Sequence, residues 1–113
     1  RGCTLMERGL DIQKFAEELD LQTDMGVEFL RLALENVKLF DSKQQDYGSD
    51  NITLNGELGI MVRCTDKVSR MRNMLFKKLK GDTKVNHESL EDTYRDLANY
   101  GIIGTMLHKG TWK

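Results

Sequence analysis

Residues 57–81, ELGIMVRCTDKVSRMRNMLFKKLKG, decide the fold of this chain. Apolar residues recur there every three or four positions, and none of the 113 residues of the chain is proline, which together predict a long uninterrupted helix. We expect this helix to run from Glu57 to Lys80 and to end at Gly81. Its last turn is rich in lysine, which complements the negative end of the helix dipole.

The same helix is predicted to be amphipathic. At about 100° per residue, its side chains separate into an apolar face and a polar face. The apolar face consists of Met61, Cys64, Val68, Met71 and Leu75. The polar face consists of Arg63, Asp66, Lys67, Arg70, Asn73 and Lys77. Taken alone, this pattern indicates an ordinary helix with one buried and one solvated side.

Two helices are predicted before this stretch. A short helix covers residues 4–20, where the spacing of apolar residues predicts one buried face. That face consists of Ile12, Phe15, Ala16 and Leu19. A longer helix is capped by Thr23 or Asp24, runs to about Asp46 and stops at Gly48.

A loop and a last helix complete the predicted fold. Residues 49–56 are rich in Asp, Asn and Gly, which tolerate turns, so we expect a loop there. The last helix begins after Asn86, whose side chain can cap free amide groups, and continues to about Leu107. The chain is therefore predicted to be an all-α bundle of three long helices and one short N-terminal helix. We expect a single domain over residues 1–113, with the N-terminal helix in 1–22 and the bundle in 23–113.

Composition excludes several classes of protein. The formal net charge of −1 provides no global attraction to nucleic acid or to an anionic membrane. The two cysteines, Cys3 and Cys64, lack a metal-ligand spacing and do not suggest a disulfide framework. No apolar run approaches the roughly 20 residues of a membrane span, and no signal-peptide pattern is present. We therefore expect a cytoplasmic protein, and a homo-oligomer because small domains often gain stability by self-association.

The last predicted helix carries an arc of polar residues that leads into apolar surface. The arc consists of Glu88, Asp92, Arg95, Asp96 and Asn99, and it continues into Ile103 and Met106. Much of the other side consists of Leu90, Tyr94, Leu97, Ala98, Gly101 and Thr105. We therefore expect this helix to be buried nearly all round. Carboxylates carried inward must be paired, hydrogen-bonded or bound to metal, because an isolated buried charge is costly.

These carboxylates allow two interpretations. In the structural interpretation, two carboxylates of the last helix pair with two arginines of the preceding helix and only fix the helix register. These four residues are Asp92, Asp96, Arg63 and Arg70. In the functional interpretation, arginines grip phosphate oxygens while acids and amides read a base or ribose, or hold Mg²⁺.

Three motifs in order support the functional interpretation. They are Lys43-x-x-Asp46-Tyr47-Gly48, then Gly59 followed by Val62-Arg63-x-x-Asp66-Lys67-x-x-Arg70, then Glu88-Ser89-x-x-Asp92-Thr93-x-x-Asp96-Leu97-x-x-Tyr100. This ordered set resembles the nucleotide modification associated domain family, a set of small all-α proteins common in bacteriophage genomes. The resemblance covers about residues 30–108. The fold it implies is also similar to that of the MazG-type all-α nucleoside-triphosphate pyrophosphohydrolases.

The resemblance implies a role in phage nucleotide metabolism or modification. Our first hypothesis is a phage-type nucleotide-binding protein in the host cell cytoplasm that captures a nucleotide or, by extension from the phage association, a nucleotide-derived defence signal. The expected ligand-binding residues are Lys43, Asp46, Tyr47, Arg63, Asp66, Lys67, Arg70, Glu88, Asp92, Asp96, Asn99 and Tyr100. Within this set, we expect the four cations to hold phosphates, and Asp92, Asp96 and Asn99 to hydrogen-bond ribose or base. Tyr47 or Tyr100 is expected to stack on the base.

A Mg²⁺-dependent nucleotide pyrophosphohydrolase or nucleotide-modification enzyme is the alternative. MazG-type enzymes hold Mg²⁺ through a Glu-x-x-Glu pair and a later Glu-x-x-Asp pair, whereas the first pair here reads Arg63-x-x-Asp66-Lys67. A cation thus stands where a metal ligand would be needed, and it supplies positive charge to phosphate directly. The candidate metal ligands are Asp66, Glu88, Asp92 and Asp96. A third hypothesis is a structural or protein-binding role, in which the six methionines form an adaptable interaction surface. Trp112 is expected to pack against a neighbouring chain rather than to stack on a base.

Overall fold

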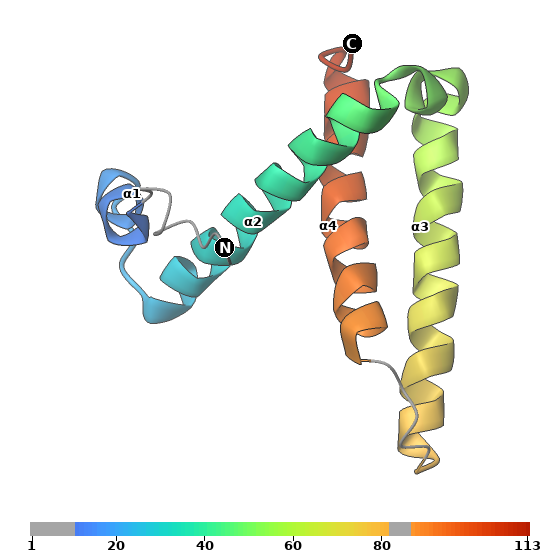
Figure 1. The fold of residues 1–113 in the computed structure, drawn as a ribbon, viewed down its shortest axis with the longest axis horizontal. Coiled ribbons are helices and arrows are strands. Elements are labelled where there is room, and N and C mark those ends of the chain that lie inside the picture. The colour runs from blue at the N-terminus through green and yellow to red at the C-terminus, as the bar shows by residue number, and fades with distance from the viewer. Residues whose placement is uncertain (1–10, 82–86) are drawn as a thin grey trace. The chain divides into compact units, whose positions relative to one another are not determined.

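The regular elements of the structure are α-helices. The structure is a computed structural model that describes residues 11–81 and 87–113, with the side chains of all of these except residues 87 and 88. These ranges contain α1 (Ile12–Glu18), α2 (Asp24–Tyr47), α3 (Asp50–Leu79) and α4 (His87–Lys109), and no strand (Figure 1). The predicted all-α fold of three long helices and one short helix is confirmed.

The chain divides into two compact units, Arg1–Ser42 and Lys43–Lys113. The first unit contains α1 and most of α2, while the second contains the end of α2 together with α3 and α4. The boundary therefore falls within α2. The predicted single domain, with its division after residue 22, stays a prediction.

In the first unit, α1 begins later than predicted, and its cap explains where it starts. Asp11 is the N-cap residue, and its carboxylate accepts hydrogen bonds from two backbone N–H groups of the first turn, at 3.0 and 3.3 Å. Residues 4–10, where the predicted start falls, lie outside the described ranges. Ile12 and Ala16 are buried as predicted, whereas Leu19 is the C-cap residue and is exposed.

The bounds of α2 agree with the prediction. Thr23 is the capping residue rather than Asp24, because its hydroxyl accepts a hydrogen bond from the backbone N–H of Gly26 at 2.9 Å. The helix ends at Tyr47, and Gly48 follows with a φ of 68°, a left-handed conformation that favours glycine. Although α2 and α3 have 24 and 30 residues, no helix in the described ranges combines the length and apolar character needed to cross a membrane.

The predicted loop at residues 49–56 is wrong, because most of this segment is helical. The first turns of α3 begin at Asp50, and the Thr53 hydroxyl donates to the backbone carbonyl of Ser49 at 3.0 Å. Ile52 is buried and gives these turns an apolar anchor. Gly56 then interrupts the helix with a φ of 57° and a ψ of −145°. The turn-tolerant residues therefore form a kinked helix instead of a loop.

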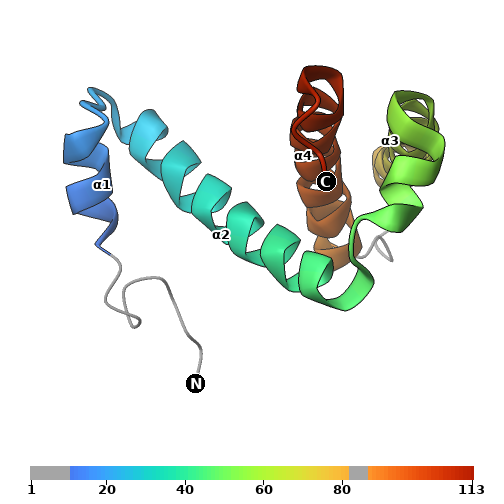
Figure 2. The same ribbon diagram turned by 90° about the horizontal axis from the view of Figure 1, so that it is seen from above.

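In the second unit, α3 and α4 pack side by side as an antiparallel pair (Figure 1), and Figure 2 shows the same pair viewed along the helices. Their buried apolar side chains include Ile60 from α3 and Leu90 and Ile103 from α4. Gly104 of α4 faces Ile60 of α3, since a Cβ atom at position 104 would lie at an ordinary van der Waals distance, 3.5 Å, from Cγ2 of Ile60. Ile60 and Gly104 therefore lie level with each other in the register of the two helices.

The buried side of α3 differs from the predicted apolar face. Met61 and Val68, which were predicted on that face, are 59% and 48% exposed. Between residues 60 and 74, the buried and half-buried side chains are Ile60, Arg63, Cys64, Lys67, Met71 and Met74. Two predicted polar-face cations therefore lie on the packing side. Their long aliphatic stems can cover apolar surface while the charged ends remain near water.

The last helix is buried along one side, not nearly all round as predicted. Leu90, Thr93 and Ile103 are buried, whereas Tyr94 and Ile102 are about half exposed or more. The end of α4 at Lys109 lies close to the predicted end, and the predicted capping residue at position 86 lies outside the described ranges. The polar arc therefore has one shielded edge and one solvated edge.

Candidate functional site

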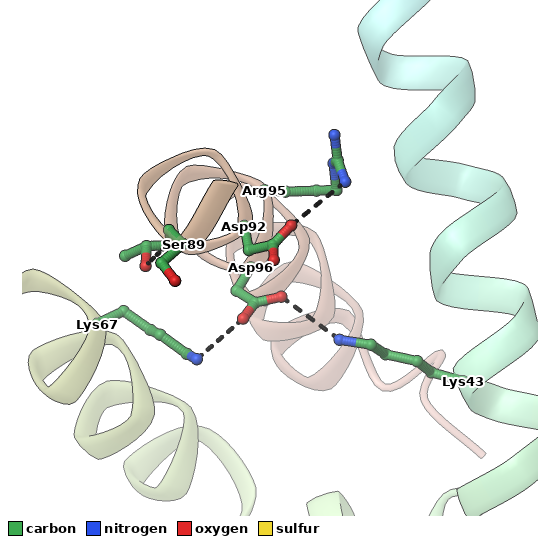
Figure 3. A network of polar contacts seen from close by, with 7 residues as sticks. Lys43, Lys67, Ser89, Asp92, Arg95 and Asp96 are labelled. Atoms are coloured by element: carbon green, nitrogen blue, oxygen red, sulfur yellow. Dashed lines mark hydrogen bonds and ion pairs between the residues drawn. The ribbon is translucent and has the colours of Figure 1, made fainter. Parts of the chain in front are cut away.

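The carboxylate of Asp96 on α4 forms ion pairs with two lysines from two other helices (Figure 3). Nζ of Lys67 on α3 lies 2.9 Å from Oδ2 of Asp96, and Nζ of Lys43 near the end of α2 lies 3.4 Å from Oδ1. The side chains of Asp96 and Lys67 are only 18% and 24% exposed, whereas that of Lys43 is 52% exposed. The contact with Lys67 is therefore the stronger of the two, since it is shorter and less screened by water.

Burial and the two lysines act in opposite directions on the pKa of Asp96. Partial burial by itself raises the pKa of this carboxyl, because it disfavours the charged form. The hydrogen bond from Lys67 and the positive charges of Lys43 and Lys67 outweigh burial and hold the pKa of Asp96 below its ordinary value. Asp96 is consequently a carboxylate at neutral pH.

One helical turn away, α3 and α4 bring a third cation against an aromatic ring. Arg63 precedes Lys67 by four residues and Tyr100 follows Asp96 by four, so antiparallel helices place Arg63 and Tyr100 together on the next turn. The guanidinium carbon of Arg63 lies 6.0 Å from the centroid of the Tyr100 ring. This distance is at the far end of the range for a cation–π contact. Ile60 and Gly104 face each other one turn further along the same register. We call Lys43, Arg63, Lys67, Asp96 and Tyr100 the Asp96 cluster.

The position of Lys43 depends on the turn between α2 and α3. Nε2 of Gln44 donates to Oγ of Ser49 at 2.5 Å, and Nε1 of Trp112 donates to the backbone carbonyl of Ser49 at 3.3 Å. The hydroxyl of Ser49 also donates to the main-chain oxygen of Lys113. These hydrogen bonds tie the turn to the residues that follow α4. Lys43 immediately precedes Gln44, whose side chain is part of this network.

Five predicted ligand-binding residues form the Asp96 cluster, and the others are not joined to it by an ion pair or hydrogen bond among the described side chains, or lie outside those side chains. The exposed carboxylate of Asp92 lies 3.6 Å from Arg95 of the same helix. Of the other predicted residues, Asn99 is half-buried. The exposed ones are Asp46, Tyr47, Asp66 and Arg70. The side chain of Glu88 lies outside those that the structure describes. A ligand role for these residues stays a prediction.

The ion pairs differ from those of the predicted structural network. Asp96 pairs with two lysines instead of arginines, and Asp92 pairs within its own helix. Arg63 lies against Tyr100 instead. The reason is the helix register, which sets Lys67 level with Asp96 and Arg63 one turn further along.

The described residues do not form a set of metal ligands. Within 11–81 and 89–113, where side chains are described, no group of three or more His, Cys, Asp or Glu side chains could hold a metal ion. Asp96 is held by two ammonium groups, and the carboxylate of Asp92 is exposed beside Arg95. The carboxylates of Asp92 and Asp96 as they lie here do not fit Mg²⁺, which prefers several oxygen ligands in octahedral geometry.

Two features that support the site were not predicted from the sequence. Thr93, one turn before Asp96, is only 1% exposed, and its hydroxyl donates to the backbone carbonyl of Ser89 at 2.7 Å. This bond satisfies the hydroxyl within α4 and so allows its burial. Thr93 belongs to the third sequence motif, which was the only sequence signal for its role. The contact between Trp112 and Ser49 has no comparable signal, because it joins residues 63 positions apart.

Comparison with known proteins identifies the family of this chain. No curated protein and no solved structure matches it, so the similarity of its fold to MazG-type enzymes stays a prediction. The family model described as nucleotide modification associated domain 1 matches residues 43–107. This span begins at Lys43 and contains every member of the Asp96 cluster. The description associates the domain with nucleotide modification. The chain belongs to the nucleotide modification associated domain 1 family, as its three motifs predicted.

Proposed function

We propose that this domain binds a nucleotide or a nucleotide-derived molecule by its phosphate groups at the Asp96 cluster. The observation that carries this proposal is the meeting of three cations from α2 and α3 beside one carboxylate and one tyrosine of α4. Membership of a family associated with nucleotide modification supports the same class of ligand. In the phage setting that the motifs suggest, such a protein would sequester a nucleotide-derived defence signal.

The Asp96 cluster has the charge that a phosphate ligand requires. Three cations and one carboxylate give it a net charge of +2 at neutral pH, where Asp96 is ionised. Phosphate oxygens are strong acceptors for lysine and arginine donors. Lys43 has the greatest freedom to reach a ligand, since its side chain is half exposed and its contact with Asp96 is the longer one.

Aromatic and amide groups beside the cluster suit the remainder of a nucleotide. Tyr47 lies four residues after Lys43 on α2, so the two side chains are neighbours on one helix face. Tyr47 is exposed and can stack on a base while Lys43 holds a phosphate. Asn99 is half-buried near Tyr100, and we assign its amide to hydrogen bonds with ribose or base.

The experiment that tests this proposal compares two lysines of α3. Lys67→Met removes the shielded cation of the cluster, and Lys77→Met makes the same chemical change at an exposed position in the last turn. Each protein is titrated calorimetrically with nucleoside phosphates, cyclic nucleotides and ADP-ribose derivatives. We expect Lys67→Met to weaken binding at least ~10-fold, because a hydrogen bond to a charged group contributes about 1.5–3 kcal/mol. Lys77→Met should bind the ligand as tightly as the unaltered protein does. Equal affinities of the two variants would show that the Asp96 cluster is not the ligand site.

The chemical fate of the ligand separates binding from catalysis. The protein is incubated with each ligand, with and without Mg²⁺, and the free ligand is analysed by mass spectrometry before and after heat denaturation. We expect the bound ligand to return intact on heating in both conditions. A product that forms only with Mg²⁺ would contradict the binding proposal and support the metal-dependent enzyme.

A further inference from the structure

α3 carries a second apolar side, which is exposed. This outer stripe consists of Leu58, Met61, Val62, Val68, Phe76 and Leu79, each between 48% and 81% exposed. At 100° per residue these side chains fall within an arc of about 120°, roughly opposite the shielded Ile60, Lys67 and Met71. Single exposed apolar residues are ordinary, but a stripe that continues over about six turns is typical of an interaction surface.

Four residues of this stripe follow the spacing of a helix–helix seam. Leu58, Met61, Val68 and Leu79 fall on positions that alternate steps of three and four residues, the pattern by which two helices pack along their length. The positions between them on this pattern are 65, 72 and 75, which are Thr, Arg and the half-buried Leu75. Thr65 interrupts the apolar series, but its hydroxyl donates to the backbone carbonyl of Met61 at 3.0 Å. The guanidinium carbon of Arg72 lies 5.3 Å from the ring centroid of Phe76, which keeps this side chain along the stripe. Both polar residues are therefore compatible with a seam.

The charges beside the outer stripe differ between its two halves. At 100° per residue, Glu57 and Asp66 flank the first half of the stripe, whereas Arg72 lies on its second half. Two α3 helices aligned in parallel would set Arg72 against Arg72 of the other copy, whereas antiparallel helices centred on Val68 set Arg72 near Asp66 of the other copy.

We propose that two copies of this chain associate through their outer stripes, with the two α3 helices antiparallel. A two-fold axis near Val68 would pair Leu58 of one copy with Leu79 of the other, and Met61 with Phe76. The same patch would then serve both copies, as two-fold symmetry requires. Six of the nine side chains within this arc are apolar, so a second copy of the same stripe is a complementary occupant. This association is independent of the proposed nucleotide site.

The size of the outer stripe fits a reversible dimer. A side chain of these types buries about 60–120 Å² of apolar surface when fully covered, so six that are roughly 60% exposed offer about 350 Å² per copy. Since roughly 60% of a typical interface is apolar, the pair would bury about 1,200 Å² in total. This area lies at the lower edge of specific interfaces and predicts a dimer that dissociates on dilution.

Sedimentation equilibrium tests this association with a matched pair of variants. Val68→Glu adds a negative charge at the centre of the stripe, and Asn73→Glu adds the same charge at an exposed polar position of α3. The average mass of the unaltered protein should rise from 13.0 kDa toward twice that value with concentration. We expect Val68→Glu to lower the association constant at least ~10-fold and Asn73→Glu to change it less than ~3-fold. A protein that stays monomeric, or two variants that behave alike, would overturn the proposal.

Circular dichroism checks that the variants keep their helices. If Val68→Glu loses its helical signal, Leu79→Glu is used in its place, since Leu79 is the exposed last residue of α3. The same fall of the association constant, at least ~10-fold, is then expected of Leu79→Glu. Orientation is tested by disulfide cross-linking of Leu58→Cys and Leu79→Cys proteins in which both natural cysteines are serine. The antiparallel arrangement predicts disulfides in a mixture of the two variants and none with either alone. Efficient linking of either variant to itself would indicate parallel helices and overturn the proposal.

Discussion

Replacing Asp96 with Asn removes the negative charge that two lysines share while it keeps the size of the side chain. The contact with Lys67 is short and shielded, so its loss costs about 1.5–3 kcal/mol, the range for a hydrogen bond to a charged group. The contact with Lys43 is longer and half exposed, and it contributes less than about 0.5 kcal/mol. We therefore expect Asp96→Asn to lower the free energy of unfolding by about 2 kcal/mol.

Urea denaturation at neutral pH measures this change. The protein concentration is held constant, because self-association would stabilise the folded state by mass action. Asp92→Asn is the matched control, since it makes the same substitution on α4 at an exposed carboxylate 3.6 Å from its partner Arg95. We expect the control to change the free energy of unfolding by less than about 0.5 kcal/mol. Equal losses of stability in the two variants would refute the reasoning.

The pH dependence of the same measurement provides an independent check. The pKa of Asp96 is lower in the folded protein than its ordinary value, so its ion pairs stabilise the fold above about pH 4. This stabilisation is lost as the pH falls through the folded-state pKa. The stability difference between the unaltered protein and Asp96→Asn should therefore be constant near neutral pH and shrink below about pH 4. A difference that persists unchanged in acid would show that it does not arise from the carboxylate charge.

Urea denaturation also tests the kink and the core of the second unit. Gly56→Ala should lower the free energy of unfolding by about 1–3 kcal/mol, because its φ of 57° with ψ of −145° suits only glycine. Gly101→Ala should raise the free energy of unfolding by about 0.5–1 kcal/mol, since this helical glycine has open space around it. If both glycine variants lowered the free energy of unfolding, the difference between the kinked position 56 and the helical position 101 would be contradicted. Ile103→Ala should cost about 2–4 kcal/mol because Ile103 is buried, while its exposed neighbour Ile102→Ala should cost less than about 0.5 kcal/mol. Similar effects at the two isoleucines would contradict the observed packing.

The helices of this chain are predictable because their ends depend on local chemistry. The Thr23 hydroxyl starts α2, and glycines with positive φ follow α2 at Gly48 and α3 at Gly81. The helical turns before Gly56 were not predictable in this way, since their Asp and Asn residues favour turns. Burial of Ile52 overrides that local preference, and burial depends on the tertiary fold.

The members of the Asp96 cluster were predictable, but their pairing was not. Arg63 and Lys67 are both cations on nearby turns of α3, and a helical wheel cannot decide which of them meets Asp96. The register of the two helices decides it, and this register depends on their tertiary packing, in which Ile60 faces Gly104. The helical periodicity also predicted that Lys67 lies on the solvated face, because lysine counts as polar in this pattern although its aliphatic stem can pack on apolar surface.

The two lysines at Asp96 have different physical roles. Lys67 is shielded and close, so it links α3 to α4 and contributes to stability. Lys43 is half exposed at 3.4 Å, so it can leave Asp96 for a phosphate oxygen at little cost to the fold. If Lys43 turns to a ligand, Asp96 remains neutralised by Lys67, and no carboxylate is left shielded without a cation. Substitution of Lys43 should therefore weaken ligand binding with little loss of stability, whereas substitution of Lys67 should reduce both.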